Sequence, residues 1–399
     1  MSQIFTADEL AFRDEARRFF RTAIPREIRD KVAEDRHLTR EDLVTTQRLM
    51  NARGWAVPHW PRAWGGRDWS PVQLYLYHDE MQQAAVPPPL PFNVSMVGPV
   101  IAAFGDEAQK RRFLPAIANL DLWFCQGFSE PGAGSDLASL TTTARREDGH
   151  FVVDGQKTWT TLAQHADWIF CLVRTDPAAK KQAGISFLLI DMRSPGITVR
   201  PIRTIDGGCE INEVFFDGVR VPVGNLVGEA NKGWEYAKFL LSNERTGIAR
   251  IGISKERIRR LKRLAAREPA GGARLIDDPR FREKLAAVEV ELQALEFTQL
   301  RMLSRERGRP AGSPDPASSI LKIKGSEVQQ ATTELLLDLV GPHAAPVCEQ
   351  TERGWVSPST GPDCAGGAAP TYFNWRKVSI YVGSNEIQRN IVAKAILGL

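Results

Sequence analysis

The hydrophobic pattern of this chain changes its period in the middle. Short runs rich in β-branched and aromatic residues, separated by turn residues, fill the stretch from about 123 to 228. Examples are Trp168–Val173, Ile185–Ile190 and Glu213–Phe216. Such runs are typical of strands, and we expect a compact, mostly antiparallel β region here. The stretches before and after it have helical spacing, so the predicted order is helical, β, helical.

The first part of the chain is predicted to be helical. Thr6 and Glu9 have the spacing of a capping box, and apolar residues follow at helical intervals. Further helices are expected over 40–52 and 70–85. The helical pattern around Pro115 is expected to break at that residue, because proline lacks a backbone N–H.

Helical spacing returns after residue 231. Glu244 is expected to share one helix face with four apolar residues. A buried carboxylate is costly unless it is paired or used in function. Both interpretations stay open: an ion pair, for example with neighbouring Arg245, or a functional acid. The positions of this stripe, at steps of four and three, are Ala237, Leu241, Glu244, Ile248 and Ile251.

Composition excludes several classes of protein. The chain has 399 residues and a net charge of +4, which is too small to indicate nucleic-acid binding. The five cysteines are scattered, without a C-x-x-C pair, and predict free thiols in a reducing cytoplasm. We expect no signal peptide and no membrane span, since the necessary apolar runs are missing. No metal-ligand cluster is found, so no metal site is predicted.

A glycine-rich turn spans Phe124–Asp136. Gly132 and Gly134 would let backbone N–H groups approach a ligand closely, because no Cβ stands in the way. Ser129 and Ser135 add hydroxyl groups. Such a turn suits a pyrophosphate or a flavin edge, although the third glycine of a dinucleotide fingerprint is missing. An ordinary turn without a ligand is the alternative.

Two further motifs accompany this turn, at Asp154–Thr161 and Tyr381–Asn390. In this order and spacing, the three segments resemble the acyl-CoA dehydrogenase family over nearly the whole chain. The resemblance implies an α+β fold. Its parts would be an N-terminal helical domain over 1–122, a middle antiparallel β domain over 123–228 and a C-terminal helical domain over 229–399. It also implies an FAD-dependent oxidoreductase that dehydrogenates an acyl-CoA thioester between its α and β carbons.

The resemblance also implies where FAD binds. Residues 126–135 match the segment that meets the flavin edge and the pyrophosphate. Trp159 matches a tryptophan that packs on the flavin, with core packing in a strand as the alternative, and Thr161 matches a hydroxyl near N5. Ser384 and Glu386 match positions that meet the adenosine. The cofactor-binding candidates are Gln126, Phe128, Ser129, Gly134, Ser135, Trp159, Thr160, Thr161, Asp338, Gly341, Ser384 and Glu386.

One departure from the family concerns the catalytic base. Most members carry a glutamate directly after the tyrosine of a Tyr-x-Gly-Thr-like motif, whereas this chain has Val382, which cannot take a proton. In a subset of the family the base lies in a Leu-x-x-Glu-Arg sequence after the β domain, which here is Leu241–Arg245. We therefore predict that Glu244 removes the α proton while the β hydride passes to flavin N5. The acyl-CoA-binding candidates are Ser135, Ser242, Arg245 and Val382.

A second departure concerns assembly. Members that bind FAD across a homodimer usually carry Arg-x-x-Phe-Gly after the base helix, and we find no such motif between Arg257 and Phe281. Asp338 replaces the glutamine of a Gln-x-x-Gly-Gly stretch, ahead of Gly341. These features resemble the large subunit of pimeloyl-CoA-type and steroid side-chain dehydrogenases. They imply a homologous partner subunit in a heterodimer or heterotetramer, with a homo-oligomer as the alternative. The family also implies electron-transfer flavoprotein as the electron acceptor.

Other functions stay open at this point. Flavin-dependent monooxygenases of the same fold also lack the usual glutamate, and a subunit that has lost catalysis would keep the fold. The basic stretch 255–267 is interpreted as a solvated helical face, with guidance of the CoA phosphates as the alternative. The space beside Val382 would suit branched, ringed or long acyl groups.

Overall fold

The computed structural model describes residues 5–243, 247, 249–306, 316–351, 354–356 and 361–399. Internal contacts divide the chain into two compact units. The sheet unit comprises Leu43–Asp68 and Pro89–Glu244. The helical unit comprises Met1–Asp42, Trp69–Pro88 and Arg245–Leu399. The three domain bounds expected from the sequence stay a prediction.

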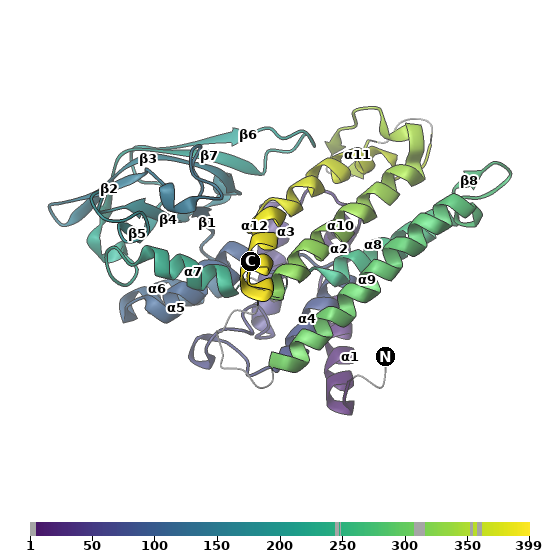
Figure 1. The fold of residues 1–399 in the computed structure, drawn as a ribbon, viewed down its shortest axis with the longest axis horizontal. Coiled ribbons are helices and arrows are strands. Elements are labelled where there is room, and N and C mark those ends of the chain that lie inside the picture. Colours follow the sequence, from purple (N-terminus) through teal and green to yellow (C-terminus); the bar gives the residue numbers. More distant parts are fainter. Residues whose placement is uncertain (1–4, 244–246, 248, 307–315, 352–353, 357–360) are drawn as a thin grey trace. The chain divides into compact units, whose positions relative to one another are not determined.

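The sheet unit is built around a sheet of seven strands, all within the described residues 124–222 (Figure 1). The strand order is β1-β4-β2-β3-β7-β6, and β5 also pairs with β4. Both β1 and β2 pair with β4 in parallel, and the other pairs are antiparallel. The expected, mostly antiparallel sheet is therefore confirmed. The strands are β1 (Phe124–Gly127), β2 (Thr143–Glu147), β3 (His150–Thr161), β4 (Trp168–Arg174), β5 (Ile185–Asp191), β6 (Ile197–Ile202) and β7 (Ile211–Pro222).

The core of this unit lies along β4 and β5. Both faces of these two strands are buried, which explains why their sequences are continuous apolar runs. Helix α7 (Gly233–Asn243) packs against β5, and the unit also contains the π-helical segment η2 (Phe92–Val97) and helix α5 (Gly98–Phe104).

Helix α6 (Glu107–Ala118) runs through Pro115, so the expected break is wrong. The helix gives up one backbone hydrogen bond there, since proline has no N–H to donate. Phe113, Leu114 and Ile117 are buried around the proline. Their packing offsets the lost hydrogen bond, and sequence periodicity alone does not reveal that packing.

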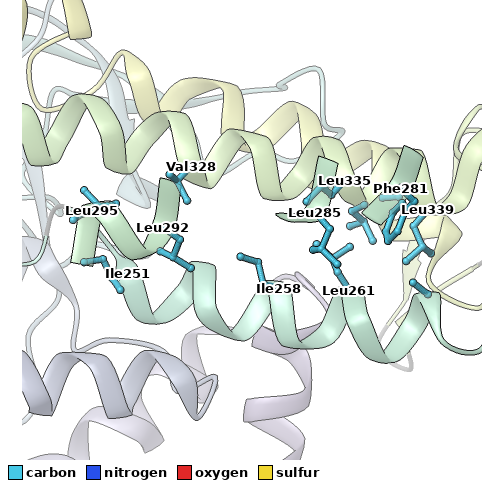
Figure 2. Close-up of a cluster of buried hydrophobic side chains, with 14 of the residues drawn as sticks. Ile251, Ile258, Leu261, Phe281, Leu285, Leu292, Leu295, Val328, Leu335 and Leu339 are labelled. Carbon is cyan, nitrogen blue, oxygen red and sulfur yellow. The ribbon is translucent and has the colours of Figure 1, made fainter. Parts of the chain in front are cut away.

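In the helical unit, α8, α9 and α10 run side by side (Figure 1). Their apolar faces meet in one cluster, in which the side chains of Leu261, Leu285 and Leu335 lie close together (Figure 2). The capping box at Thr6 and Glu9 is confirmed. None of the helices in the described ranges is both long and apolar enough to cross a lipid bilayer. The helices of this unit are α1 (Ala7–Thr22), α2 (Arg26–Ala33), α4 (Pro71–Gln83), α8 (Ile251–Ala265), α9 (Pro279–Glu306), α10 (Ser318–Val340), α11 (Ala365–Asn374) and α12 (Asn385–Val392), and α3 (Arg40–Ala52) spans the boundary between the units.

The basic helix α8 is only partly a solvated face. The ammonium of Lys255 lies 2.6 Å from Glu296 and 3.2 Å from Asp79. The guanidinium of Arg257 is buried and donates to Asp35 at 2.6 Å. The expectation of solvation is therefore wrong for these two residues, because acids distant in sequence provide their partners. Guidance of CoA phosphates by α8 stays a prediction.

The helical stripe expected around Glu244 does not continue to Ile251. Helix α7 is described as far as Asn243, and α8 begins at Ile251 after Arg250, whose backbone is left-handed with φ 48°. A left-handed residue interrupts the helical register, so Ile251 does not lie on a continuous face with Ala237. Glu244 itself lies outside the described residues.

Candidate functional site

The glycine-rich turn after β1 divides into a buried part and an open part. Phe128 is buried, with its ring against Phe170 and Phe187, so its side chain belongs to the core. Gln126 and Ser129 are half-buried. Only the backbone of Phe128 is therefore left for contact with a ligand.

The open part contains Gly132, Gly134 and Ser135, which are exposed. A Cβ added at either glycine would meet nothing within 4 Å. The chain itself therefore does not require glycine at these positions. The close approach of backbone to a ligand at these glycines stays a prediction.

A buried ion pair fastens this turn to β3. The Lys157 ammonium lies 2.7 Å from the Glu130 carboxylate, and their side chains are 0% and 3% exposed. Lys157 also donates to the carbonyl of Phe128 at 3.2 Å. The Glu130 carboxylate accepts backbone N–H groups of Thr141 and Thr142 at 2.6 and 2.9 Å. We call Glu130 and Lys157 the turn clamp.

The turn clamp was missed by the sequence interpretation. Both residues lie inside the motifs on which the family resemblance rests. From the sequence alone, a charged residue in such a segment is expected to be exposed to solvent. The available signal was Lys157 at an inward position of a predicted strand, where an unpaired ammonium would be costly.

A β-bulge on β3 presents Trp159. Lys157 pairs with Val214 and Thr160 with Asn212, so β3 has one residue more than β7 across this interval. Trp159 has φ 58° and is 61% exposed. Within the sheet unit, the alternative of core packing for Trp159 is therefore wrong. A large flat ring is available to a planar ligand.

The bulge lies beside the glycine-rich turn. The backbone N–H of Thr158 donates to the carbonyl of Ser129 at 2.9 Å. Thr161 is half-buried. Thr160 is buried and its hydroxyl has no hydrogen-bond partner in the described structure, which calls for an explanation such as a ligand or water. The sheet unit thus places Ser129 of the turn beside the bulge that carries Trp159.

A second group of candidates lies in the helical unit, before α12. Val382 and Gly383 both have left-handed backbone, with φ 59° and 78°. The side chain of Ser384 caps α12 by accepting the N–H of Ile387 at 3.4 Å. Glu386 is 74% exposed and lies 3.6 Å from Arg389. A β-branched residue in the left-handed region is strained, and such strain often marks functional sites.

Asp338 and Gly341 are not brought to this turn within one chain. Asp338 lies near the end of α10 and pairs with Lys284 at 2.7 Å. Gly341 ends α10 with φ 53°, a conformation that favours glycine. Asn385 in the turn bonds to Ser326 of α10, which helical rise separates from Asp338 by roughly 18 Å.

Three acyl-CoA-binding or catalytic candidates have no described side chain. Glu244 and Arg245 lie outside the described residues, and Ser242 is described only as part of α7. Among the described residues, His, Cys, Asp and Glu form no group of three that could hold a metal ion.

Three domain descriptions of one family match the chain almost end to end. They are the N-terminal, middle and C-terminal domains of acyl-CoA dehydrogenase, over residues 6–121, 125–219 and 231–397. The chain belongs to the acyl-CoA dehydrogenase family. It is therefore an oxidoreductase of the acyl-CoA dehydrogenase type, in a family that generally binds FAD.

Individual relatives agree with this membership. The acyl-CoA dehydrogenase IpdE1 of Mycobacterium tuberculosis is 36% identical over 88% of this chain and 86% of its own length. FadE26 of the same organism is 33% identical over 99% and 98%. Among solved structures, the ChsE4-ChsE5 complex from Mycobacterium tuberculosis has a TM-score of 0.83 at 33% identity, covering 99% of this chain and 98% of that one. The "Tcur3481-Tcur3483 steroid ACAD" also has a TM-score of 0.83, at 31% identity and with the same coverage.

The residues of this acyl-CoA dehydrogenase fit an FAD cofactor. The sheet unit offers an exposed indole at Trp159, the unpartnered hydroxyl of Thr160 and the exposed residues Gly132, Gly134 and Ser135. A flat aromatic face and a hydroxyl suit an isoalloxazine ring, and backbone N–H groups suit a pyrophosphate.

The turn clamp predicts a specific acid sensitivity. Burial raises the pKa of Glu130, but the Lys157 charge and the hydrogen bonds lower it from the ordinary 4.5 to about 2. A lowered folded pKa stabilises the fold above pH 4.5, and this stabilisation, on the order of 3 kcal/mol, is lost as pH falls toward 2. Urea unfolding of the protein and of Glu130→Gln should show a stability gap that narrows below pH 4.5. A gap independent of pH would contradict the prediction.

Proposed function

We propose that this chain dehydrogenates an acyl-CoA thioester between its α and β carbons, with Glu244 as the base that removes the α proton. Bound FAD would accept the hydrogen and electron pair from the β carbon. Trp159, Thr160 and Thr161 would hold the flavin, and the backbone of Gly132–Ser135 the pyrophosphate. Ser384 and Glu386 would meet the adenosine.

The observation that carries the choice of Glu244 is Val382 at the usual position of the base. The nearest carboxylate in that motif, Glu386, is exposed and its pKa is lowered by backbone and Ser384 hydrogen bonds. A base for a weakly acidic α C–H needs the opposite, a dry site that raises its pKa. Glu244 follows the last residue of α7 and precedes Arg245, as in the family subset with a displaced base.

The other residues would bind and orient the thioester. As enolate character develops, the thioester oxygen needs hydrogen-bond donors. The backbone N–H of Val382 can supply one donor, since that role needs no side chain. Ser135, Ser242 and Arg245 would bind the acyl-CoA. With no carboxylate at Val382, the acyl pocket would suit branched, ringed or long chains, and the steroid named for one structural relative supports a ringed substrate.

We also propose that a homologous partner subunit completes the FAD site. Support comes from two structural relatives that are two-component complexes by name. Within this chain, Asp338 and Gly341 lie far along α10 from the Ser384 turn, so one chain does not gather all the candidates. Such a heteromer would pass its electrons to electron-transfer flavoprotein. A homo-oligomer is the alternative assembly.

The partner proposal predicts incomplete cofactor binding by the isolated chain. We expect well below one FAD per chain after purification alone, and stoichiometric FAD after co-expression with a homologous acyl-CoA dehydrogenase subunit. Absorbance of released flavin against protein concentration measures the ratio. One FAD per chain with full turnover in the isolated protein would contradict the partner requirement.

The reaction itself is tested by anaerobic titration with a panel of acyl-CoA thioesters, with and without the partner. Bleaching of the flavin by a thioester supports dehydrogenation. A flavin that stays oxidised with every thioester, but forms a C4a-peroxyflavin after chemical reduction and exposure to oxygen, would indicate a monooxygenase instead. No reaction of either kind would indicate a subunit without catalysis.

A further inference from the structure

Lys322 of α10 is a buried cation with one described hydrogen-bond partner. Its side chain is 3% exposed. The ammonium donates to Oδ1 of Asn385 at 2.8 Å, and no carboxylate in the described part of the chain forms an ion pair with it. A buried charge without a counter-ion is costly and calls for a reason.

Asn385 connects Lys322 to the start of α12. Asn385 is buried, and its Nδ2 donates to the hydroxyl of Ser326 at 3.0 Å. The first residue of α12 is therefore held to α10 by two polar contacts on one side chain. Ser384, immediately before it, caps the same helix.

The turn that leads into α12 is strained and held from the other side. Nε2 of Gln388 donates to the carbonyls of Val382 and Gly383 at 3.3 and 3.4 Å. A valine with φ 59° is strained and persists only where surrounding contacts fix it. Gln388 contacts the turn directly, whereas Lys322 holds Asn385, the residue at the start of the following helix.

We propose that Lys322 is a positioning residue, which holds Asn385 and thereby fixes the left-handed turn at Val382 and Gly383. The inference rests on the proposed function, in which this turn meets the thioester oxygen and FAD. Lys322 touches neither ligand in this scheme and acts through Asn385. The buried lysine would then orient the turn rather than stabilise the fold.

The charges around Lys322 leave it sensitive to pH. Burial lowers its pKa to about 8, and the field of Glu386 raises it. Charged residues on α10 and on the elements packed against it form ion pairs with one another and not with Lys322. These pairs are Lys324 with Glu291 and Glu327, Arg389 with Glu327 and Glu386, Arg376 with Glu334, Lys255 with Asp79 and Glu296, and Arg257 with Asp35. Above pH 8 the lysine loses its charge, and its hydrogen bond to Asn385 weakens.

Replacing Lys322 by methionine separates positioning from stability. A lysine whose pKa is lowered on folding destabilises the fold at neutral pH, so Lys322→Met should unfold at the same or a higher urea concentration. Flavin reduction by acyl-CoA should nevertheless slow by roughly tenfold, because a displaced donor stabilises the enolate poorly. The decline of this rate above pH 8 should disappear in the variant.

A readout without substrate tests the same inference. Amide hydrogen exchange over residues 381–386 should be faster in Lys322→Met than in the unmodified protein at pH 7. Lys324→Met is the matched control, since Lys324 lies on the same helix and pairs at the surface with Glu291 and Glu327. It should change neither exchange nor rate.

The outcomes are distinguishable. Unchanged exchange over 381–386 in Lys322→Met would overturn the positioning role, whatever the activity. Faster exchange in a protein that no acyl-CoA reduces would support the positioning role and reject the proposed reaction. A lower urea midpoint with faster exchange throughout the protein would show a purely structural role and overturn the inference.

Discussion

Glu244→Gln should lower the rate of flavin reduction by acyl-CoA by roughly 10²–10⁴-fold, the contribution typical of a positioned general base. Glutamine has nearly the same shape as glutamate but cannot accept the α proton. Binding of the thioester depends on other groups, so its dissociation constant should change little. Anaerobic stopped-flow measurement of flavin bleaching gives the rate, and equilibrium titration gives the affinity.

The matched control is Glu235→Gln in the first turn of α7. Glu235 is exposed and pairs with Lys232 at 3.2 Å, so its removal should leave the rate unchanged. FAD content and urea unfolding of both variants show whether each protein is folded. A folded, FAD-loaded Glu244→Gln that reduces its flavin at the original rate would reject Glu244 as the base.

Lys157→Met should destabilise the sheet unit by about 3–5 kcal/mol, because it leaves the Glu130 carboxylate buried without its counter-ion. The turn from Ser129 to Ser135 then loses its attachment to β3, and FAD affinity should fall as well. Urea unfolding measures the stability, and flavin fluorescence during dilution measures the affinity.

Two further variants show whether the loss of stability comes from the buried, unpaired charge. Arg145→Met removes an exposed ion pair with Asp154 at 3.1 Å and should cost less than about 1 kcal/mol. Adding Glu130→Leu to Lys157→Met should restore part of the stability, since no unpaired charge remains. Recovery stays partial, because the N–H groups of Thr141 and Thr142 lose their acceptor. If Lys157→Met unfolds at the original urea concentration, the turn clamp does not stabilise the fold.

Local patterns predicted most of the regular structure. Helix α3 has the bounds that periodicity indicates, and the β-branched and aromatic runs became strands. Pro115 misled the prediction because tertiary packing outweighed the loss of one hydrogen bond. At Arg250 the predicted helical stripe is interrupted, and a left-handed residue inside an apolar stripe leaves no clear signal in the sequence.

The candidate site was predictable only where a motif is contiguous. The turn after β1 and the exposed Trp159 followed from short sequences, but the pair of Glu130 and Lys157 joins two of them. Arg257 and Asp35 are still farther apart in sequence, and their contact depends on how helices pack. Such long-range pairing of opposite charges cannot be read from one sequence, which is why α8 was expected to be solvated.

The extra residue of β3 also limits how the length of this chain can change. Deleting one residue between Lys157 and Thr160 would remove the bulge, although both flanks of β3 could keep their present pairing with β7. The left-handed backbone that presents the indole of Trp159 would be lost with the bulge. Natural insertions and deletions should therefore avoid this strand and collect in surface hairpins such as the one joining β8 (Pro269–Ala270) to β9 (Ala273–Arg274).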